Sequence, residues 1–293
     1  MTSIHTLVPD IQETISKKDG WFTTELANSL ATDISLRLQE HLGEKKQKPR
    51  LRLSGMGPKC PKQLWHSIHT PELAEPLSPS AELKYSYGHV LEALLVTLAK
   101  ASGHEVTGEQ DEVIADGITG HRDCIIDGCI VDVKSASSLS YLKFKSGSIG
   151  QNDDFGYLDQ LDGYLLASVQ DNLVRVKDRA YLLAIDKTLG HICLYEHQFR
   201  ERSIRERISK YKQIVALGSP PQCECETINE GEAGNVRLDT RASYSPFKYC
   251  CCPSLRTFLY SNGPRYLTKV VKRPWNKDGP ITEVDKFGKI VYN

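Results

Sequence analysis

The sequence predicts an α/β core that follows a helical segment and precedes a cysteine-containing region. Three observations support this prediction. Apolar residues recur at helical spacing near the N-terminus and around residue 90, apolar β-rich runs lie between residues 118 and 195, and Gly, Pro and Cys dominate after residue 217. We expect a helical N-terminal region over 1–77, a core over 78–217, and a C-terminal region over 218–293 that packs back on the core.

The composition is that of an ordinary globular protein. Of 293 residues, 40% are hydrophobic and 25% are charged, which excludes wholesale disorder, collagen and coiled coil. Lys and Arg total 37, as do Asp and Glu, so the chain has no bulk charge to coat nucleic acid, although a local basic groove is still compatible with it. We find no secretory signal and no stretch able to span a bilayer, so we expect a cytoplasmic protein with no membrane partner.

Two helices are expected before the strands. Leu26, Leu30 and Ile34 belong to a four-residue apolar repeat that predicts an amphipathic helix over 24–43. Ser78 followed by Pro79 is typical of a helix start, and this helix should continue to about residue 103. Glu92 lies on it beside apolar neighbours and shares a face with a glycine four residues earlier. It is a candidate metal ligand or, alternatively, a surface residue at the edge of the apolar stripe.

A hairpin around Asp-Gly at 127–128 carries most of the chemical information, because Asp-Gly between apolar runs is typical of a two-residue turn. This register sets Asp123 opposite Asp132, and His121 opposite Lys134. Since side chains alternate along a strand, Asp123, Asp132 and Lys134 share one face. Two opposed carboxylates repel each other, whereas a cation such as Mg²⁺ between them makes the interaction attractive. The alternative is a solvent-exposed polar face, but the apolar flanks favour a buried sheet.

Four elements are expected after the hairpin. They are a helix over 154–167 with Asp153 as a cap, strands over 180–185 and 191–195, and a helix over 199–217. On the first of these helices, Gln160 and Tyr164 lie four residues apart and therefore on one face. The pair could hold a nucleotide or phosphate, or it could belong to an ordinary half-buried helix face.

The order of these residues resembles the RecB-type branch of the PD-(D/E)XK nucleases. Glu92 after Gly-His, Gly-x-x-Asp ending at Asp123, Asp-x-Lys ending at Lys134, and Gln-x-x-x-Tyr ending at Tyr164 occur in the family's order between residues 88 and 195. The resemblance implies a restriction-endonuclease-like fold, with a mixed central sheet flanked by helices. It also implies metal-dependent phosphodiester hydrolysis, often from DNA ends.

The resemblance assigns a role to each of these residues. Lys134 would be the catalytic lysine, and Gln160 and Tyr164 an accessory motif that contacts DNA or organises the site. Some members carry a metal-ligating histidine before the acidic motifs, for which His121 and His89 are candidates here. The Mg²⁺ or Mn²⁺ ligands would be Glu92, Asp123, Asp132 and the backbone carbonyl of Val133.

The nine cysteines favour metal ligation or burial, because no secretion signal points to disulfides. Many RecB-type nucleases hold a [4Fe–4S] cluster through one cysteine before the core and a Cys-x₂-Cys-x₅-Cys motif after it. Cys60, followed by proline, resembles the first. The later motif falls on Ala242, Ser245 and Cys251, so two expected thiolates are missing.

Two interpretations of the cysteines follow. Either the cluster is lost and its scaffold kept, or other cysteines replace the missing pair; the available substitutes are Cys223, Cys225, Cys250 and Cys252. A zinc site from the same residues is a further alternative, although the spacing is not that of a zinc ribbon. We expect Cys124, Cys129 and Cys193, which fall in predicted strands, to be buried small hydrophobes.

We predict a divalent-metal-dependent DNA nuclease, an exonuclease acting on free or single-stranded ends in replication, recombination or repair. Basic residues near aromatic ones suit single-stranded nucleic acid, and the candidates are Lys143, Lys145, Arg265 and Lys269. A helicase or other recombination protein is an expected partner, because RecB-type domains often work beside one. The alternative is a non-catalytic nucleic-acid-binding or metal-cluster module on a retained nuclease scaffold, against which the intact acids and lysine argue.

Overall fold

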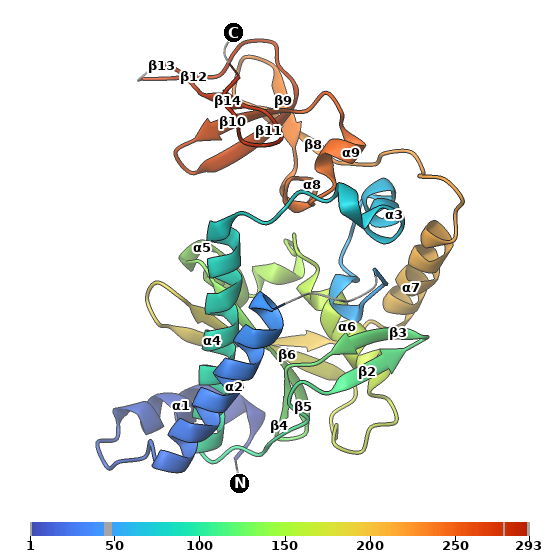
Figure 1. The fold of residues 1–293 in the computed structure, drawn as a ribbon. Coiled ribbons are helices and arrows are strands. Elements are labelled where there is room, and N and C mark those ends of the chain that lie inside the picture. Colours follow the sequence, from blue (N-terminus) through green and yellow to red (C-terminus); the bar gives the residue numbers. More distant parts are fainter. Residues whose placement is uncertain (1, 44–48, 278, 292–293) are drawn as a thin grey trace. The chain divides into compact units, whose positions relative to one another are not determined.

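The computed structural model describes residues 2–43, 49–277 and 279–291, and the chain forms two compact units (Figure 1). The first unit comprises residues 1–57 and 77–208. The second comprises residues 58–76 and 209–293. The segment around Cys60 therefore belongs with the C-terminal cysteines.

A mixed five-stranded sheet forms the centre of the first unit. Its strands β5 and β6 are parallel, while the other neighbours are antiparallel. Parallel neighbours need a crossover, which here contains helices α5 (Ser138–Ser146) and α6 (Tyr157–Ala167). The expected mixed sheet flanked by helices is confirmed. Its strand order is β1 (Val106–Thr107), β4 (Cys124–Ile126), β5 (Cys129–Ala136), β6 (Arg179–Asp186) and β7 (Ile192–Gln198).

Helices α1 (Leu7–Ser16) and α4 (Pro79–Ala101) pack their apolar residues on one face of this sheet, against Val131 and Val133 of β5. Because side chains alternate, Asp132 and Lys134 project to the other face, where α6 lies. The predicted start of α4 is confirmed, since the Ser78 side chain accepts a hydrogen bond from the Ala81 amide. Helix α2 (Thr24–Leu42) matches the helix predicted over 24–43, and it lies against α4.

The hairpin register is confirmed near the turn and wrong farther out. Cys124 pairs with Val131, as Asp-Gly at 127–128 predicts. His121, however, does not face Lys134. It ends strand β3 (Ile118–His121), which pairs with β2 (Glu112–Ala115) in a separate two-stranded sheet. The expected pairing stops at Cys124 because the buried Arg122 guanidinium is held by Asp111 at 2.8 Å and by Asp171 at 2.5 Å.

The elements after the hairpin lie close to their expected positions. Helix α6 begins three residues later than predicted, and Asp153 caps it by accepting hydrogen bonds from the amides of Gly156, Tyr157 and Leu158. Strands β6 and β7 and helix α7 (Glu201–Val215) match the predicted segments to within a few residues. None of the helices among the described residues is both long and apolar enough to cross a membrane.

The second unit contains an antiparallel sheet that the sequence pattern did not predict. Helices α3 (Pro61–His69), α8 (Thr240–Tyr244) and α9 (Lys248–Cys251) belong to the same unit. Two further short strands, β12 (Trp275–Asn276) and β13 (Gly279–Pro280), pair with each other. The strand order of the main sheet is β14 (Glu283–Val284), β10 (Arg256–Tyr260), β11 (Gly263–Lys269), β9 (Asn235–Leu238) and β8 (Thr227–Glu230).

Candidate active site

The β4–β5 hairpin positions two aspartates. Asp132 lies within β5 and is 1% exposed, while Asp123 directly precedes β4 and is half-buried. The Val133 amide donates a hydrogen bond to Asp123 Oδ2 at 2.7 Å, which fixes this carboxylate beside β5. The structure thus brings together the two acids that the sequence placed opposite each other.

Lys134 and Gln160 both contact Asp132. Lys134 Nζ lies 2.6 Å from Asp132 Oδ2, and Gln160 Nε2 donates to Asp132 Oδ1 at 3.1 Å. Gln160 Oε1 accepts a hydrogen bond from Lys134 Nζ at 3.4 Å, and Gln160 Nε2 donates to the Tyr164 hydroxyl at 2.8 Å. Helix α6 therefore holds Gln160 in an orientation that ties the lysine and the aspartate together.

The glycine of the Gly-x-x-Asp motif has a packing role. A Cβ atom on Gly120 would lie 2.8 Å from Leu53 Cβ and 3.0 Å from Tyr164 Cε1. The absence of a side chain thus lets Tyr164 approach β3. Gly88 differs, since a Cβ there would meet Ser135 Oγ at 3.7 Å, an ordinary van der Waals contact.

Glu92 on α4 is held by a residue of α2. Arg37 forms an ion pair with Glu92 and bonds Asp33 Oδ1 at 2.8 Å, and Gln110 Nε2 donates to Glu92 Oε1 at 2.8 Å. The side chains of Arg37 and Glu92 are 6% and 13% exposed. The carboxylate of Glu92 is thus charge-compensated within the chain.

Burial governs the electrostatics of the three acids. Burial, followed by the charge of Glu92, raises the pKa of Asp123 to about 7. Burial also raises the pKa of Asp132 to about 7, although the charge of Lys134 opposes this. The pKa of Glu92 is likewise raised by burial, against the opposing charge of Arg37. Burial lowers the pKa of Lys134, but the negative charges of Asp132 and Asp123 outweigh this effect, so the pKa is raised.

These residues fit a divalent cation. Hard cations take carboxylate and carbonyl oxygens, and a bound cation would favour the ionised form of Asp123 and Asp132, whose pKa values burial raises. The oxygens of Glu92, Asp123 and Asp132 do not form a group within 4.8 Å of one another, as judged over the described residues. Glu92 instead faces Arg37 and Gln110, so it must move to share a cation with both aspartates.

The remaining predicted site residues lie elsewhere. His121 is exposed and lies 3.7 Å from Glu112 Oε2, and the ring of His89 lies against that of His41. Among the basic residues, Lys143 pairs with Asp154 at 3.1 Å and Arg265 pairs with Glu230. The other two, Lys145 and Lys269, are exposed.

Sequence reasoning missed two residues of the site. Arg37 is the buried residue of α2, whereas the sequence pattern pointed only to the apolar residues of this helix. Tyr157, in the first turn of α6, presents its ring to Lys134, with Nζ 5.0 Å from the ring centroid. The available signal for Arg37 was its position four residues after Asp33, which places an acid and a base on one helix face. For Tyr157 it was an aromatic residue one helical turn before Gln160.

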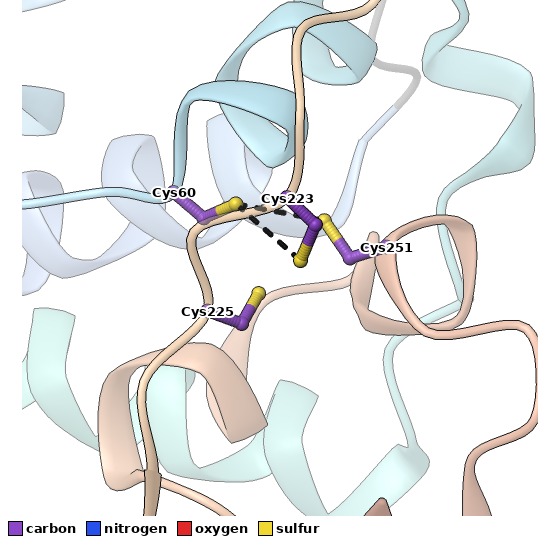
Figure 2. A group of neighbouring side chains, drawn as sticks. All are labelled: Cys60, Cys223, Cys225 and Cys251. Carbon is purple, nitrogen blue, oxygen red and sulfur yellow. Dashed lines mark hydrogen bonds between the residues drawn. The ribbon is translucent and has the colours of Figure 1, made fainter.

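Four cysteines gather in the second unit (Figure 2). Cys60 precedes α3, Cys223 and Cys225 lie on the loop before β8, and Cys251 ends α9. Their Sγ atoms all lie within 4.8 Å of one another. This is the one such group of His, Cys, Asp or Glu ligand atoms in the described part of the chain, and it could hold a metal ion.

The group includes both substitutes on the loop. Cys223 and Cys225 join Cys60 and Cys251, although Ala242 and Ser245 occupy the positions expected for two thiolates. Of the other two candidates, Cys250 Sγ lies 4.0 Å from the Leu73 carbonyl oxygen, and Cys252 packs against an apolar cluster. The three remaining cysteines are Cys124 and Cys129, which are buried in the first sheet as expected, and Cys193, which is half-buried.

No family model matches the sequence, and no curated protein matches it. Similar solved structures include SSO0001 (19% identity, 78% of this chain, 97% of that chain, TM-score 0.41). A phage-related exonuclease from Haemophilus somnus 129PT shows 15% identity over 58% of this chain and 94% of that chain, with a TM-score of 0.39. LHK-Exo, an alkaline exonuclease from Laribacter hongkongensis, was solved in complex with dAMP. It shows 12% identity over 58% of this chain and 87% of that chain, with a TM-score of 0.39. Likenesses with such TM-scores carry no argument about function.

Proposed function

We propose that the first unit is a divalent-metal-dependent DNA nuclease, an exonuclease that acts on free or single-stranded ends. One observation carries the proposal: Asp123 and Asp132 are held together at the β4–β5 hairpin, with Lys134 on Asp132. Buried acids with raised pKa values beside a buried lysine are typical of a functional site. The motif resemblance supports phosphodiester hydrolysis and DNA as the substrate.

Each residue has a role in this proposal. Glu92, Asp123, Asp132 and the Val133 carbonyl would hold Mg²⁺ or Mn²⁺. When bound, the cation would polarise the phosphodiester and lower the pKa of the attacking water. Lys134 keeps its proton beside Asp132 and would stabilise negative charge that develops on the phosphate.

The remaining residues orient the reacting groups. Gln160 fixes both Asp132 and Lys134, and Tyr164 in turn fixes Gln160. Lys143, Lys145, Arg265 and Lys269 are proposed DNA contacts, of which Lys145 and Lys269 are exposed. Ends of the proposed kind arise in replication, recombination and repair, where a helicase or other recombination protein would supply them.

Digestion of end-labelled single- and double-stranded DNA with Mg²⁺, Mn²⁺ or EDTA tests this function. We expect release of labelled nucleotides from an end with a divalent metal and none in EDTA. Asp132→Asn should abolish release, whereas Asp178→Asn, at an exposed aspartate of the same unit, should leave it unchanged. Undiminished digestion by Asp132→Asn would overturn the assignment. Binding of DNA without digestion under any metal would support the non-catalytic module instead.

A further inference from the structure

The four clustered cysteines connect three separate segments of the second unit. Cys60 lies at the start of α3, whereas its partners are more than 160 residues later in the chain. Cys60 and Cys251 are 9% and 7% exposed. All four are free thiols in the structure.

The spacing of the sulfur atoms separates two kinds of metal centre. The Sγ atom of Cys60 lies 3.7 Å from that of Cys251 and 4.0 Å from that of Cys223. Tetrahedral zinc with Zn–S bonds of about 2.3 Å sets neighbouring sulfur atoms about 3.8 Å apart. A [4Fe–4S] cluster instead binds each thiolate to a different iron at a corner of the cube, which sets them roughly 6 Å apart. The observed group is too small for the cluster and has the size of a single-ion site.

The surroundings provide hydrogen bonds suited to thiolates. The Glu224 amide donates to Cys60 Sγ at 3.3 Å, and Gln63 Nε2 donates to Cys225 Sγ at 3.3 Å. Donors of this kind orient metal-bound cysteines and stabilise their charge. Figure 2 shows the four side chains converging on one point.

We propose that Cys60, Cys223, Cys225 and Cys251 bind one Zn²⁺ in a closed, structural site, in place of the [4Fe–4S] cluster that the resemblance implied. Four protein thiolates fill the tetrahedral coordination of zinc, so no position is open for substrate. The thiol protons pass to solvent on binding, and the oxidation state of zinc does not change. The site cross-links α3, the loop before β8 and α9. It is independent of the nuclease proposed for the first unit.

Metal analysis of the full chain tests this proposal. The protein is produced with both iron and zinc supplied, and purified without oxygen so that an iron–sulfur cluster would survive. We expect one zinc per chain, no acid-labile sulfide and no visible absorbance. Replacement by Co²⁺ should give the d–d bands of a tetrahedral thiolate site. Iron with matching acid-labile sulfide, or a metal content near zero, would overturn the proposal.

Cysteine variants provide a second, matched measurement. Cys223→Ser should lower the zinc content and the thermal stability, because it removes one of four ligands. Cys250→Ser, a neighbouring cysteine outside the group, should retain both. Equal zinc content in the two variants would contradict the assignment. If Cys223→Ser does not fold, the Co²⁺ spectrum of the unmodified chain still decides. Asp132→Asn should retain its zinc. The zinc proposal can therefore fail or hold independently of the nuclease proposal.

Discussion

Lys134 Nζ lies 2.6 Å from Oδ2 of Asp132, the residue two positions earlier on the same strand. Residues two apart on a strand share a face, so the Asp-x-Lys spacing alone sets the acid and the lysine side by side. The ion pair is nearly closed to solvent, with Lys134 19% and Asp132 1% exposed. The charge of each residue therefore favours the ionised form of the other, against the effect of burial.

The first prediction concerns Lys134→Met. We expect DNA cleavage to fall about 10²–10³-fold at saturating Mg²⁺, because one preorganised positive charge is lost from the site. Single-turnover rates on end-labelled DNA measure this loss. Lys134→Arg, which keeps the charge but not the geometry, should lose less. Equal rates for Lys134→Met and the unmodified chain would show that the lysine has no part in the reaction.

The second prediction separates Gln160 from Tyr164. Gln160→Leu leaves Asp132 Oδ1 without its donor, so we expect a loss of about 1–3 kcal/mol in the free energy of unfolding, together with slower cleavage. Tyr164→Phe removes only the hydroxyl that accepts from Gln160 and should cost less. Urea unfolding in EDTA measures both variants. A larger loss for Tyr164→Phe would assign the organising role to the tyrosine.

Local chemistry explains why the hairpin could be predicted from sequence. Asp-Gly at 127–128 fixes the turn, and alternation then places Asp132 and Lys134 on one face without knowledge of the rest of the fold. His121 was misplaced because the ladder stops at Cys124. The cause is the ion pairs of Arg122 with distant aspartates, which no local pattern reveals.

Long-range contacts explain what the sequence did not reveal. Arg37 meets Glu92 across 55 residues, and a helical repeat does not indicate which partner a buried arginine has. The four-cysteine group likewise combines Cys251 with Cys60 and with two cysteines of the loop at 223–225. A spacing rule applied to residues 242–251 therefore identified only one of its members, Cys251. The second sheet consists of short strands, several of four residues or fewer, which give little periodicity to detect.

The third prediction is a pH dependence of stability without divalent metal. The pKa values of Asp123 and Asp132 are about 7 in the folded chain, above the ordinary value of 3.8. The folded state therefore binds more protons than the unfolded state between these values, and stability falls as pH rises through that window. The melting temperature in EDTA should decrease from about pH 5 to about pH 8.

A variant isolates the contribution of these acids. Asp132→Asn cannot ionise at position 132, so its melting temperature in EDTA should decrease less over the same range. Mg²⁺ should raise the melting temperature of the unmodified chain most at the alkaline end, where the acids are ionised. Parallel pH profiles for the two proteins would contradict the raised pKa of Asp132.

The fourth prediction contrasts two glycines. Gly120→Ala places a Cβ 2.8 Å from Leu53 and 3.0 Å from Tyr164, so we expect overpacking to cost about 1–3 kcal/mol of stability. Gly88→Ala has ordinary contacts and lies inside α4, where alanine is favoured by about 1 kcal/mol. The urea concentration at the midpoint of unfolding should therefore fall for Gly120→Ala and rise for Gly88→Ala. A destabilised Gly88→Ala would mean that the site needs the space beside Ser135.

The fifth prediction concerns the competition for Glu92. Arg37 now compensates this carboxylate, and removing one partner of a buried pair costs about 3–5 kcal/mol. Arg37→Gln should therefore lower the melting temperature in EDTA. The carboxylate that it releases is then available to a cation held by Asp123 and Asp132, so Mg²⁺ should recover more stability in this variant than in the unmodified chain.

Asp33→Asn is the matched control for Arg37→Gln. It removes the other acid that contacts Arg37 but leaves the pair with Glu92 intact. Its Mg²⁺-induced rise in melting temperature should equal that of the unmodified chain. If Arg37→Gln shows the same rise as well, then Glu92 does not ligate the cation. The metal would in that case be held by the two aspartates of the β4–β5 hairpin, and the arginine would serve only to fasten α2 to α4.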